Sequence, residues 1–426
     1  MELKLRISRA GSAIAVMGVL LVVVGSLVGP RGWSGEWPQW LGPERDGSSR
    51  EKVSREWPAD GPRVVWTRPV GRGFSGPVIS GGRLVLHHRM GEQDVVECWS
   101  VEGRGDSLWR RTRPATYRDD FGFDDGPRAT PAIAAGRVHV LGAEGNLACL
   151  DLGSGAVIWE VSLAKEFGAD KGFFGFACSP LVTDGKVMVN AGGADGAGVV
   201  AIDGDTGRTV WKATSHEAGY ASPVVVAGTG AGARIAFFTR EGLVMAAQDS
   251  GNVLAEYPWR SRQGASVNAA TPLVVGNRIF LTSSYGVGAV LLDWDGKRLS
   301  KVWSGDDSLS SHYASVVGRG GHVYGFHGRQ ESGAVLRCIE LGTGKVRWTA
   351  PAMGSGSVLL ADDVLLVMSE RGELVAASAS PDGFQVLARA QVLGTGVRAY
   401  PALAGGRFVA RDTKRMVCLE LGVPPR

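Results

Sequence analysis

Four carboxylates lie close together within residues 117–128: Asp119, Asp120, Asp124 and Asp125. Their oxygens are sufficient in number for Ca²⁺, and two aspartates can also act as general acid and base. Their spacing matches no calcium-binding loop, however, and no nucleophile can be identified beside them. The pattern favours a solvated acidic loop, partly neutralised by Arg118 and Arg128, over a metal site.

A second group of residues combines aromatic rings with arginines, a histidine and an asparagine. Its members precede regularly spaced starts of apolar runs: Phe74, Arg128, Phe176, Tyr220, Asn268, His312, Tyr313, Arg398 and Tyr400. Such side chains could hold a planar or anionic ligand by stacking and charge-assisted hydrogen bonds. Whether they meet depends on the fold.

A third candidate is the glycine-spaced aromatic stretch at residues 171–177, which contains Phe173, Phe174 and Phe176. Exposed aromatic clusters mark interaction surfaces, so Phe173 and Phe174 are candidates for contact with a protein partner. The same rings could instead fold inward as a plug, and the sequence leaves both interpretations open.

The histidines and cysteines offer little chemistry. His87 and His88 are adjacent, and neighbours on a strand point to opposite faces, so they are not expected to share a metal. The five cysteines include neither a Cys-x-x-Cys pair nor a zinc spacing. Four of them occupy equivalent repeat positions that lie far apart around a ring, which predicts unpaired, buried thiols.

The elements that must position these residues are read from an internal repeat. Residues 149–159, 201–211 and 338–348 each read as an apolar strand, a glycine turn and a second strand ending in tryptophan. The repeat's anchor positions are 39 to 52 residues apart. They are Trp66, Trp109, Trp159, Trp211, Ala255, Trp303, Trp348 and Leu387. This period, with several short strands in each unit, is typical of a β-propeller.

A second signal runs in phase with the first. Apolar runs followed by a glycine turn begin at eight positions: Pro77, Pro131, Pro180, Pro223, Pro272, Ser315, Ser357 and Pro401. Proline suits the first residue of a strand, and glycine suits a tight hairpin. We therefore predict an all-β, eight-bladed propeller of four-stranded antiparallel blades over residues 61–426.

The strand count predicts how the ring closes. Three strands follow Pro401, whereas a spare strand ending at Trp66 precedes the first blade. We expect this N-terminal strand to complete the last blade and remove two exposed sheet edges. In such a ring the segments before the innermost strands crowd one mouth of a central funnel, so the second group of residues should converge there. Alternatively, its aromatic rings plug the channel and its arginines pair with nearby acids.

The first 29 residues differ in kind from the rest. Lys4, Arg6 and Arg9 precede an uncharged apolar run, residues 13–28. This pattern predicts a secretory signal peptide or, since the run approaches membrane-spanning length, an N-terminal anchor. Either places the propeller outside the cytoplasm, in the periplasm or another extracytoplasmic space, and residues 30–60 form a leader. The formal net charge of +4 gives no electrostatic case for nucleic acid.

The repeat at residues 201–211 resembles the tryptophan-docking motif of the pyrroloquinoline quinone (PQQ) propeller superfamily. The chain as a whole, roughly residues 33–421, resembles the bacterial PQQ-like repeat proteins of the BamB-like group, and residues 37–47 are similar to a leader in secreted members. The quinoprotein dehydrogenases of the superfamily imply PQQ with Ca²⁺ as an alternative. Many of those enzymes have adjacent cysteines or a haem-attachment motif, and this chain has neither.

We therefore expect an exported, non-catalytic scaffold that binds protein partners in the cell envelope, and no cofactor. The alternatives are a PQQ-dependent oxidoreductase and a carbohydrate- or polymer-binding propeller, because one scaffold can host unrelated functions.

Overall fold

The computed structural model describes residues 35–226, 232–264 and 266–423. The chain divides into two compact units, Met1–Gly32 and Trp33–Arg426, and every described residue belongs to the second. The expected signal or anchor at residues 1–29 therefore lies outside the described residues. Within the described part of the chain, no helix is long and apolar enough to cross a membrane.

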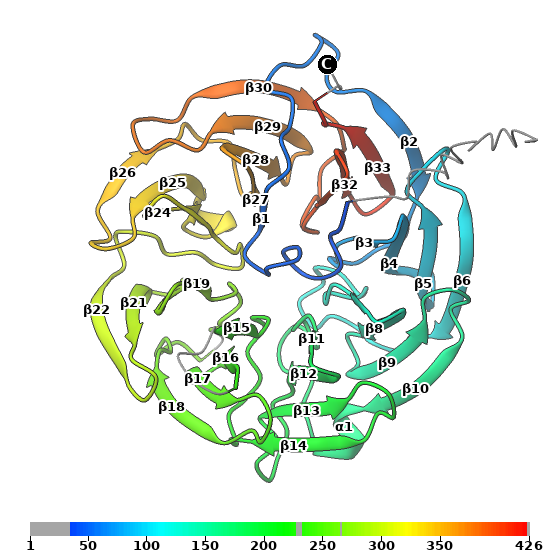
Figure 1. The fold of residues 1–426 in the computed structure, drawn as a ribbon, viewed down its shortest axis with the longest axis vertical. Coiled ribbons are helices and arrows are strands. Elements are labelled where there is room, and N and C mark those ends of the chain that lie inside the picture. Colours follow the sequence, from blue (N-terminus) through cyan, green and yellow to red (C-terminus); the bar gives the residue numbers. More distant parts are fainter. Residues whose placement is uncertain (1–34, 227–231, 265, 424–426) are drawn as a thin grey trace, which may run out of the picture. The chain divides into compact units, whose positions relative to one another are not determined.

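Eight sheets surround a central axis (Figure 1), as the repeat predicts. Blades 1 to 4 consist of β3 (Val78–Ser80), β4 (Arg83–Met90), β5 (Gln93–Ser100) and β6 (Ser107–Pro114); β7 (Ala132–Ala134), β8 (Arg137–Leu141), β9 (Asn146–Asp151) and β10 (Val157–Ser162); β11 (Leu181–Thr183), β12 (Lys186–Asn190), β13 (Val199–Asp203) and β14 (Thr209–Ala213); and β15 (Val224–Val226), β16 (Arg234–Phe238), β17 (Gly242–Ala247) and β18 (Val253–Pro258).

Blades 5 to 7 consist of β19 (Leu273–Val275), β20 (Arg278–Ser283), β21 (Gly288–Trp294) and β22 (Leu299–Gly305); β23 (Val317–Arg319), β24 (His322–His327), β25 (Val335–Glu340) and β26 (Val346–Thr349); and β27 (Gly356–Ala361), β28 (Val364–Ser369), β29 (Glu373–Ser378) and β30 (Val386–Gln391). Blade 8 consists of β31 (Ala402–Ala404), β32 (Arg407–Arg411), β33 (Arg415–Glu420) and β2 (Val64–Pro69). The remaining elements are β1 (Ser48–Ser49), the helix α1 (Leu163–Phe167) and the 3₁₀ turn η1 (Gln330–Ser332).

The ring closes as expected. Strand β2 pairs antiparallel with β33, with Trp66 opposite Cys418 and Thr67 opposite Val417. The two ends of the propeller are thus joined by backbone hydrogen bonds within one sheet, which leaves neither strand as an open edge of an incomplete blade.

Each tryptophan of the repeat docks on the next blade. The indole N–H of Trp66 donates to the carbonyl of Val101 at 3.1 Å, and its ring covers Gly105. Gly105 has φ +69, and a Cβ there would lie 2.8 Å from the Trp66 ring. The motif's glycine is therefore required twice: it makes the tight turn and it receives the tryptophan of the preceding blade.

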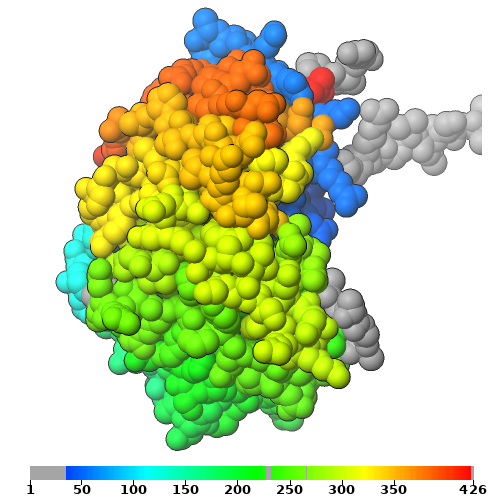
Figure 2. Space-filling model, turned by 90° about the vertical axis from the view of Figure 1, so that its left-hand side faces the viewer, coloured from blue at the N-terminus to red at the C-terminus, as the bar shows by residue number. Residues whose placement is uncertain are grey.

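The same N–H to carbonyl bond recurs at five further blade junctions. The pairs are Trp109 with Leu152, Trp159 with Gly204, Trp211 with Gln248, Trp303 with Leu341 and Trp348 with Ser380. Figure 2 shows the ring from the side, where consecutive blades, coloured from green to orange, pack closely against one another. The five cysteines are all buried and unpaired, as predicted.

The described part of the leader, residues 35–60, crosses the centre of the ring (blue in Figure 1). Trp37 exchanges two backbone hydrogen bonds with Ile79, each 2.8 Å. Strand β1 pairs in parallel with β27, Ser48 lying opposite Leu360. The leader is therefore an integral part of the propeller rather than a spacer in front of it, and this was not anticipated from the sequence.

Candidate functional site

A cavity of about 390 Å³ lies at the centre of the ring. Its walls come from the segments that precede the innermost strands and from the β20–β21 and β24–β25 connections. The lining residues used below are Trp40, Phe74, Phe121, Phe123, Arg128, Phe174, Ser179, Tyr220, Ser222, Gln263, Tyr285, His312, Tyr313, Arg329, Gln330, Glu331, Arg398 and Tyr400. The volume is that of a small-molecule site.

Seven of the nine residues in the second sequence group line this cavity: Phe74, Arg128, Tyr220, His312, Tyr313, Arg398 and Tyr400. The placement of the other two was wrong. Phe176 is buried in the core between blades 2 and 3, with its ring against Gly145. Asn268 donates its side-chain N–H groups to the carbonyls of Thr239 and Trp259, both at 2.9 Å, so it holds neighbouring loops together.

The leader provides one wall of the cavity through Trp40. Its indole ring lies 4.6 Å from that of Tyr400, centroid to centroid, and its N–H donates to the Thr271 hydroxyl at 2.9 Å. The Tyr400 hydroxyl in turn donates to the Ser315 carbonyl at 3.1 Å. Trp40 is therefore held in one orientation by both stacking and hydrogen bonding.

Arg45 of the leader binds the innermost segments of two blades. Its side chain is buried, with the residue 3% exposed. Its guanidinium donates to the carbonyls of Pro223 (2.9 Å), Pro180 (3.0 Å) and Ser179 (3.1 Å). These carbonyls precede the innermost strands of blades 3 and 4, so one side chain ties the leader to both blades. Burial lowers the pKa of Arg45 to about 10, and the group stays charged at neutral pH.

Guanidinium groups and aromatic rings alternate along one part of the wall. Arg128 and Arg398 both lie over the Phe74 ring, with their central carbons 5.6 and 5.4 Å from its centroid. Arg398 also lies 5.9 Å from the Tyr313 ring. Both arginines carry acidic partners, as the alternative interpretation required: Asp119 is 3.2 Å from Arg128, and Glu370 is 3.0 Å from Arg398.

His312 links two further residues of the cavity wall by hydrogen bonds. The His312 Nε2 atom lies 2.7 Å from the Tyr285 hydroxyl, and its Nδ1 atom lies 2.7 Å from Gln330 Oε1. Burial, outweighing the hydrogen bond to Gln330, lowers the pKa of His312, so the ring is neutral near pH 7. Because Gln330 Oε1 only accepts, Nδ1 carries the proton and Tyr285 donates to Nε2. Arg329 stacks on Tyr285 at 4.8 Å.

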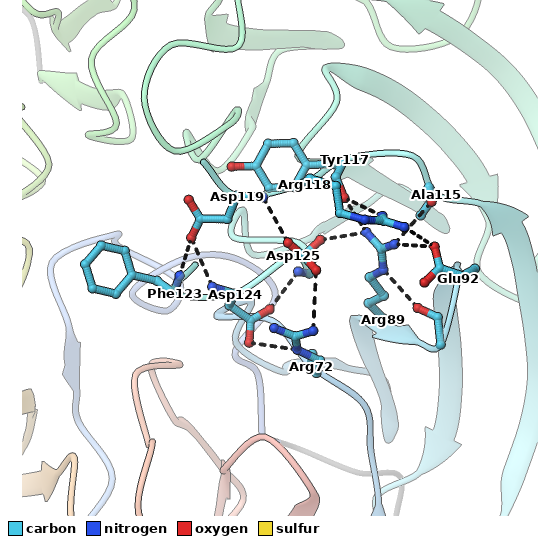
Figure 3. Close-up of polar contacts among 12 residues, drawn as sticks. Arg72, Arg89, Glu92, Ala115, Tyr117, Arg118, Asp119, Phe123, Asp124 and Asp125 are labelled. Carbon is cyan, nitrogen blue, oxygen red and sulfur yellow. Dashed lines mark hydrogen bonds and ion pairs between the residues drawn. The ribbon is translucent and has the colours of Figure 1, made fainter. Parts of the chain in front are cut away.

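The acidic loop is folded on its own carboxylates rather than solvated (Figure 3). Asp119 accepts backbone N–H groups from Phe123 at 2.8 Å and Asp124 at 3.0 Å, in addition to its ion pair with Arg128. Asp125 accepts the backbone N–H of Asp119 at 2.9 Å. Asp119 and Asp124 are buried. The expectation of a solvated loop was therefore wrong for these residues, because local backbone groups use the carboxylate oxygens.

Two arginines outside the loop stabilise it, and the sequence did not indicate either one. Buried Arg89 of β4 donates to the carbonyls of Tyr117 (2.8 Å) and Asp125 (3.1 Å). Arg72 pairs with Asp125 at 3.4 Å, whereas Arg118, expected to neutralise the loop, pairs with Glu92 (Figure 3). Asp120 is exposed and meets Lys171 at 2.7 Å.

This loop carries two of the four residues that we call the phenylalanine rim: Phe121, Phe123, Phe173 and Phe174. Phe121 is 51% exposed and Phe123 is 48% exposed. The Phe121 ring lies 5.0 Å from that of Phe174 and 6.3 Å from that of Phe173, which are both half-buried. The rim is thus a contiguous, partly exposed apolar surface beside the cavity.

The donor set of the cavity does not fit a quinone–calcium site. Glu331 is the one carboxylate among the lining residues, and its Oε2 pairs with Arg329 at 3.3 Å. Across the described residues, no group of three or more His, Cys, Asp and Glu side chains is placed to hold a metal. His87 and His88 diverge: His87 faces Asp94 across 4.0 Å, and His88 accepts the backbone N–H of Gly71 at 2.8 Å.

One protein-family model matches most of the chain. The family model described as outer membrane protein assembly factor BamB matches residues 100–350 and 331–420. No curated protein sequence matches the chain.

Solved structures share the fold at low identity. BamB from Moraxella catarrhalis is 16% identical with a TM-score of 0.61, over 85% of this chain and 99% of that one. Quinohemoprotein alcohol dehydrogenase from Comamonas testosteroni is 15% identical with a TM-score of 0.64, over 92% and 81%. A europium-containing methanol dehydrogenase is 14% identical with a TM-score of 0.67, over 90% and 89%.

Proposed function

Because the chain belongs to the family described as outer membrane protein assembly factor BamB, we propose that it is an exported, non-catalytic scaffold that binds a protein partner in the cell envelope. Export to the periplasm or another extracytoplasmic space rests on the sequence pattern of residues 1–29, which predicts a signal peptide or anchor. Residues 13–28 provide the membrane tether if the signal is retained.

The observation that carries the proposal is the phenylalanine rim. Phe121 and Phe123 are about half exposed, although they belong to a loop whose backbone is fixed by Asp119, Asp125 and Arg89. Exposed aromatic rings on a rigid support lose little conformational entropy on binding and provide anchors for a partner. The surface thus has the properties of a preorganised docking site.

The test is a pull-down from the native envelope with the full chain. We expect the double variant Phe121→Ser/Phe123→Ser to retain less partner, with a melting temperature close to that of the parent. Phe173→Ser/Phe174→Ser should also weaken capture. Val157→Ser/Ile158→Ser is the matched control, because these β10 residues are 57% and 44% exposed and lie on an outermost strand. Equal capture by the rim and control variants would exclude the rim as the interface.

The second candidate is a quinone-dependent oxidoreductase, favoured by fold similarity to the two dehydrogenases and by the arginines of the cavity. The lack of an unpaired carboxylate in the cavity lining weighs against it. We expect incubation with PQQ and Ca²⁺, followed by desalting, to leave no quinone absorbance on the protein. Stoichiometric retention would replace the scaffold proposal with this one.

A further inference from the structure

Two arginines of the cavity have donors that the protein does not use. Arg398 engages Glu370 through Nε at 3.0 Å, and Arg329 engages Glu331 through Nε at 3.3 Å. Among the described residues, no hydrogen bond involves the Nη atoms of either arginine. Each thus presents a free planar edge of N–H groups, the geometry that binds a carboxylate bidentately.

These two arginines converge on the same histidine. Both contribute to lowering the pKa of His312, after burial and beside the hydrogen bond to Gln330. Ring contacts link them as well: Arg329 stacks on Tyr285, which lies 5.3 Å from His312, and His312 lies 5.5 Å from Tyr313, over which Arg398 lies. The free donors therefore flank one continuous aromatic wall, built from blades 5 and 6 and the β30–β31 connection.

The charge of this wall suits a monovalent anion. Glu370 and Glu331 neutralise Arg398 and Arg329 in part, and His312 is neutral near pH 7. A divalent phosphate would face two carboxylates with little net positive charge to offset them. A single carboxylate, in contrast, can use the free N–H edges without requiring additional charge.

The rest of the lining can bind hydroxyl groups. The side-chain amide of Gln263 has no partner among the described residues. The Ser179 and Ser222 hydroxyls each accept a backbone N–H, at 2.9 Å, and so retain a proton to donate. Together with the Trp40 and Tyr313 rings, these groups provide both stacking faces and hydrogen-bond partners. An aromatic acid would use the faces but leave the hydroxyl partners unsatisfied.

We propose that the cavity binds an acidic sugar, the uronate ring of a glycan, with its carboxylate held by Arg398 and Arg329 and its ring stacked on the aromatic wall. The proposed carboxylate site and the phenylalanine rim adjoin each other, because Phe121, Phe123 and Phe174 also line the cavity and the Arg398 guanidinium lies 5.6 Å from the Phe123 ring centroid. The proposal does not rest on the scaffold proposal, because its argument uses the two arginines and the hydroxyl partners of the cavity, and each proposal has its own readout: trigalacturonate binding for the cavity and partner capture for the rim.

The test is a titration of the full chain with trigalacturonate, measured by calorimetry and by intrinsic tryptophan fluorescence, to which Trp40 of the cavity wall contributes. We expect saturable binding that weakens at least tenfold in Arg398→Gln and in Arg329→Gln. Arg347→Gln is the matched control, because Arg347 is an exposed arginine on β26 outside the cavity. The methyl ester of trigalacturonate, which lacks the charge but retains the hydroxyls, should bind at least tenfold more weakly than the acid.

Three results would overturn the proposal: no binding at millimolar trigalacturonate, equal affinity in the two cavity variants and the control, or equal affinity for the methyl ester. Binding of isophthalate in preference to trigalacturonate would also overturn it, since it would identify an aryl acid as the ligand. Circular dichroism and urea unfolding verify that the arginine variants are folded.

Discussion

The indole ring of Trp40 and the phenol ring of Tyr400 lie 4.6 Å apart, although one belongs to the leader and the other to the segment before the last blade. This contact makes the leader part of the cavity wall. It also joins residues from opposite ends of the propeller at its centre, in addition to the joint between β2 and β33 at its edge.

Arg45→Ala should destabilise the propeller by about 2–4 kcal/mol, because it removes the guanidinium donor from three buried carbonyls. These are the carbonyls of Ser179, Pro180 and Pro223. Urea unfolding measures the change, and limited proteolysis should show faster cleavage within residues 35–60. The exposed residue Arg50 is the control. If Arg45→Ala and Arg50→Ala unfold at the same urea concentration, the leader does not contribute to stability through Arg45.

Gly105→Ala should destabilise more than Gly103→Ala. Both glycines have a positive φ (+69 and +63), but only a Cβ at Gly105 would meet the Trp66 ring, at 2.8 Å. Each substitution costs about 1–2 kcal/mol in backbone strain, and the steric overlap adds to this at Gly105 alone. In a Trp66→Ala background, itself costing about 3–5 kcal/mol, the difference should vanish.

This comparison is a double-mutant cycle measured by urea unfolding. Additivity of Trp66→Ala and Gly105→Ala would contradict the docking of one blade's tryptophan on the next blade's glycine.

Asp94 should make stability depend on pH. The residue is 6% exposed, and burial, with a contribution from Glu144, raises its pKa to about 6 from the ordinary 3.8. Between these two values the folded protein retains a proton that the unfolded chain has released, so the free energy of unfolding falls as pH rises through this window. The ionised Asp94 is thus a net destabilising group at neutral pH.

Asp94→Asn should therefore stabilise the protein at pH 7 by about 1–2 kcal/mol and have little effect at pH 4. Urea unfolding at the two pH values measures the difference. Exposed Asp106, for which Asp106→Asn should change nothing at either pH, is the control. A stabilisation that is the same at pH 4 and pH 7 would show that the charge of Asp94 is not its cause.

The five thiols should be unreactive in the native protein. Burial raises the pKa of Cys98, Cys149, Cys178 and Cys338 to about 11 and that of Cys418 to about 12. Thiolate is the reactive form, so an aromatic disulfide reagent should label no cysteine before unfolding and five in urea. Rapid labelling of the native protein would show that a blade opens locally.

The sequence by itself determined the architecture. A glycine four residues before a tryptophan, and a proline or serine that opens each apolar run, are local patterns, and each specifies its own hairpin or blade junction. Counting them was enough to predict eight blades and the pairing of β2 with β33. Equivalent repeat positions point in similar directions, which is why seven of nine predicted residues line one cavity.

Only the tertiary structure decided what the cavity contains. Phe176 and Asn268 share the repeat position of the lining residues, but local packing turns them away. Trp40 reaches the cavity from the leader, and Tyr285 and Arg329 reach it from the β20–β21 and β24–β25 connections, which were outside the predicted set. These residues meet across long separations in sequence, where no periodic pattern operates. Their positions follow from the closed ring and from hydrogen bonds that exist only once the blades have assembled.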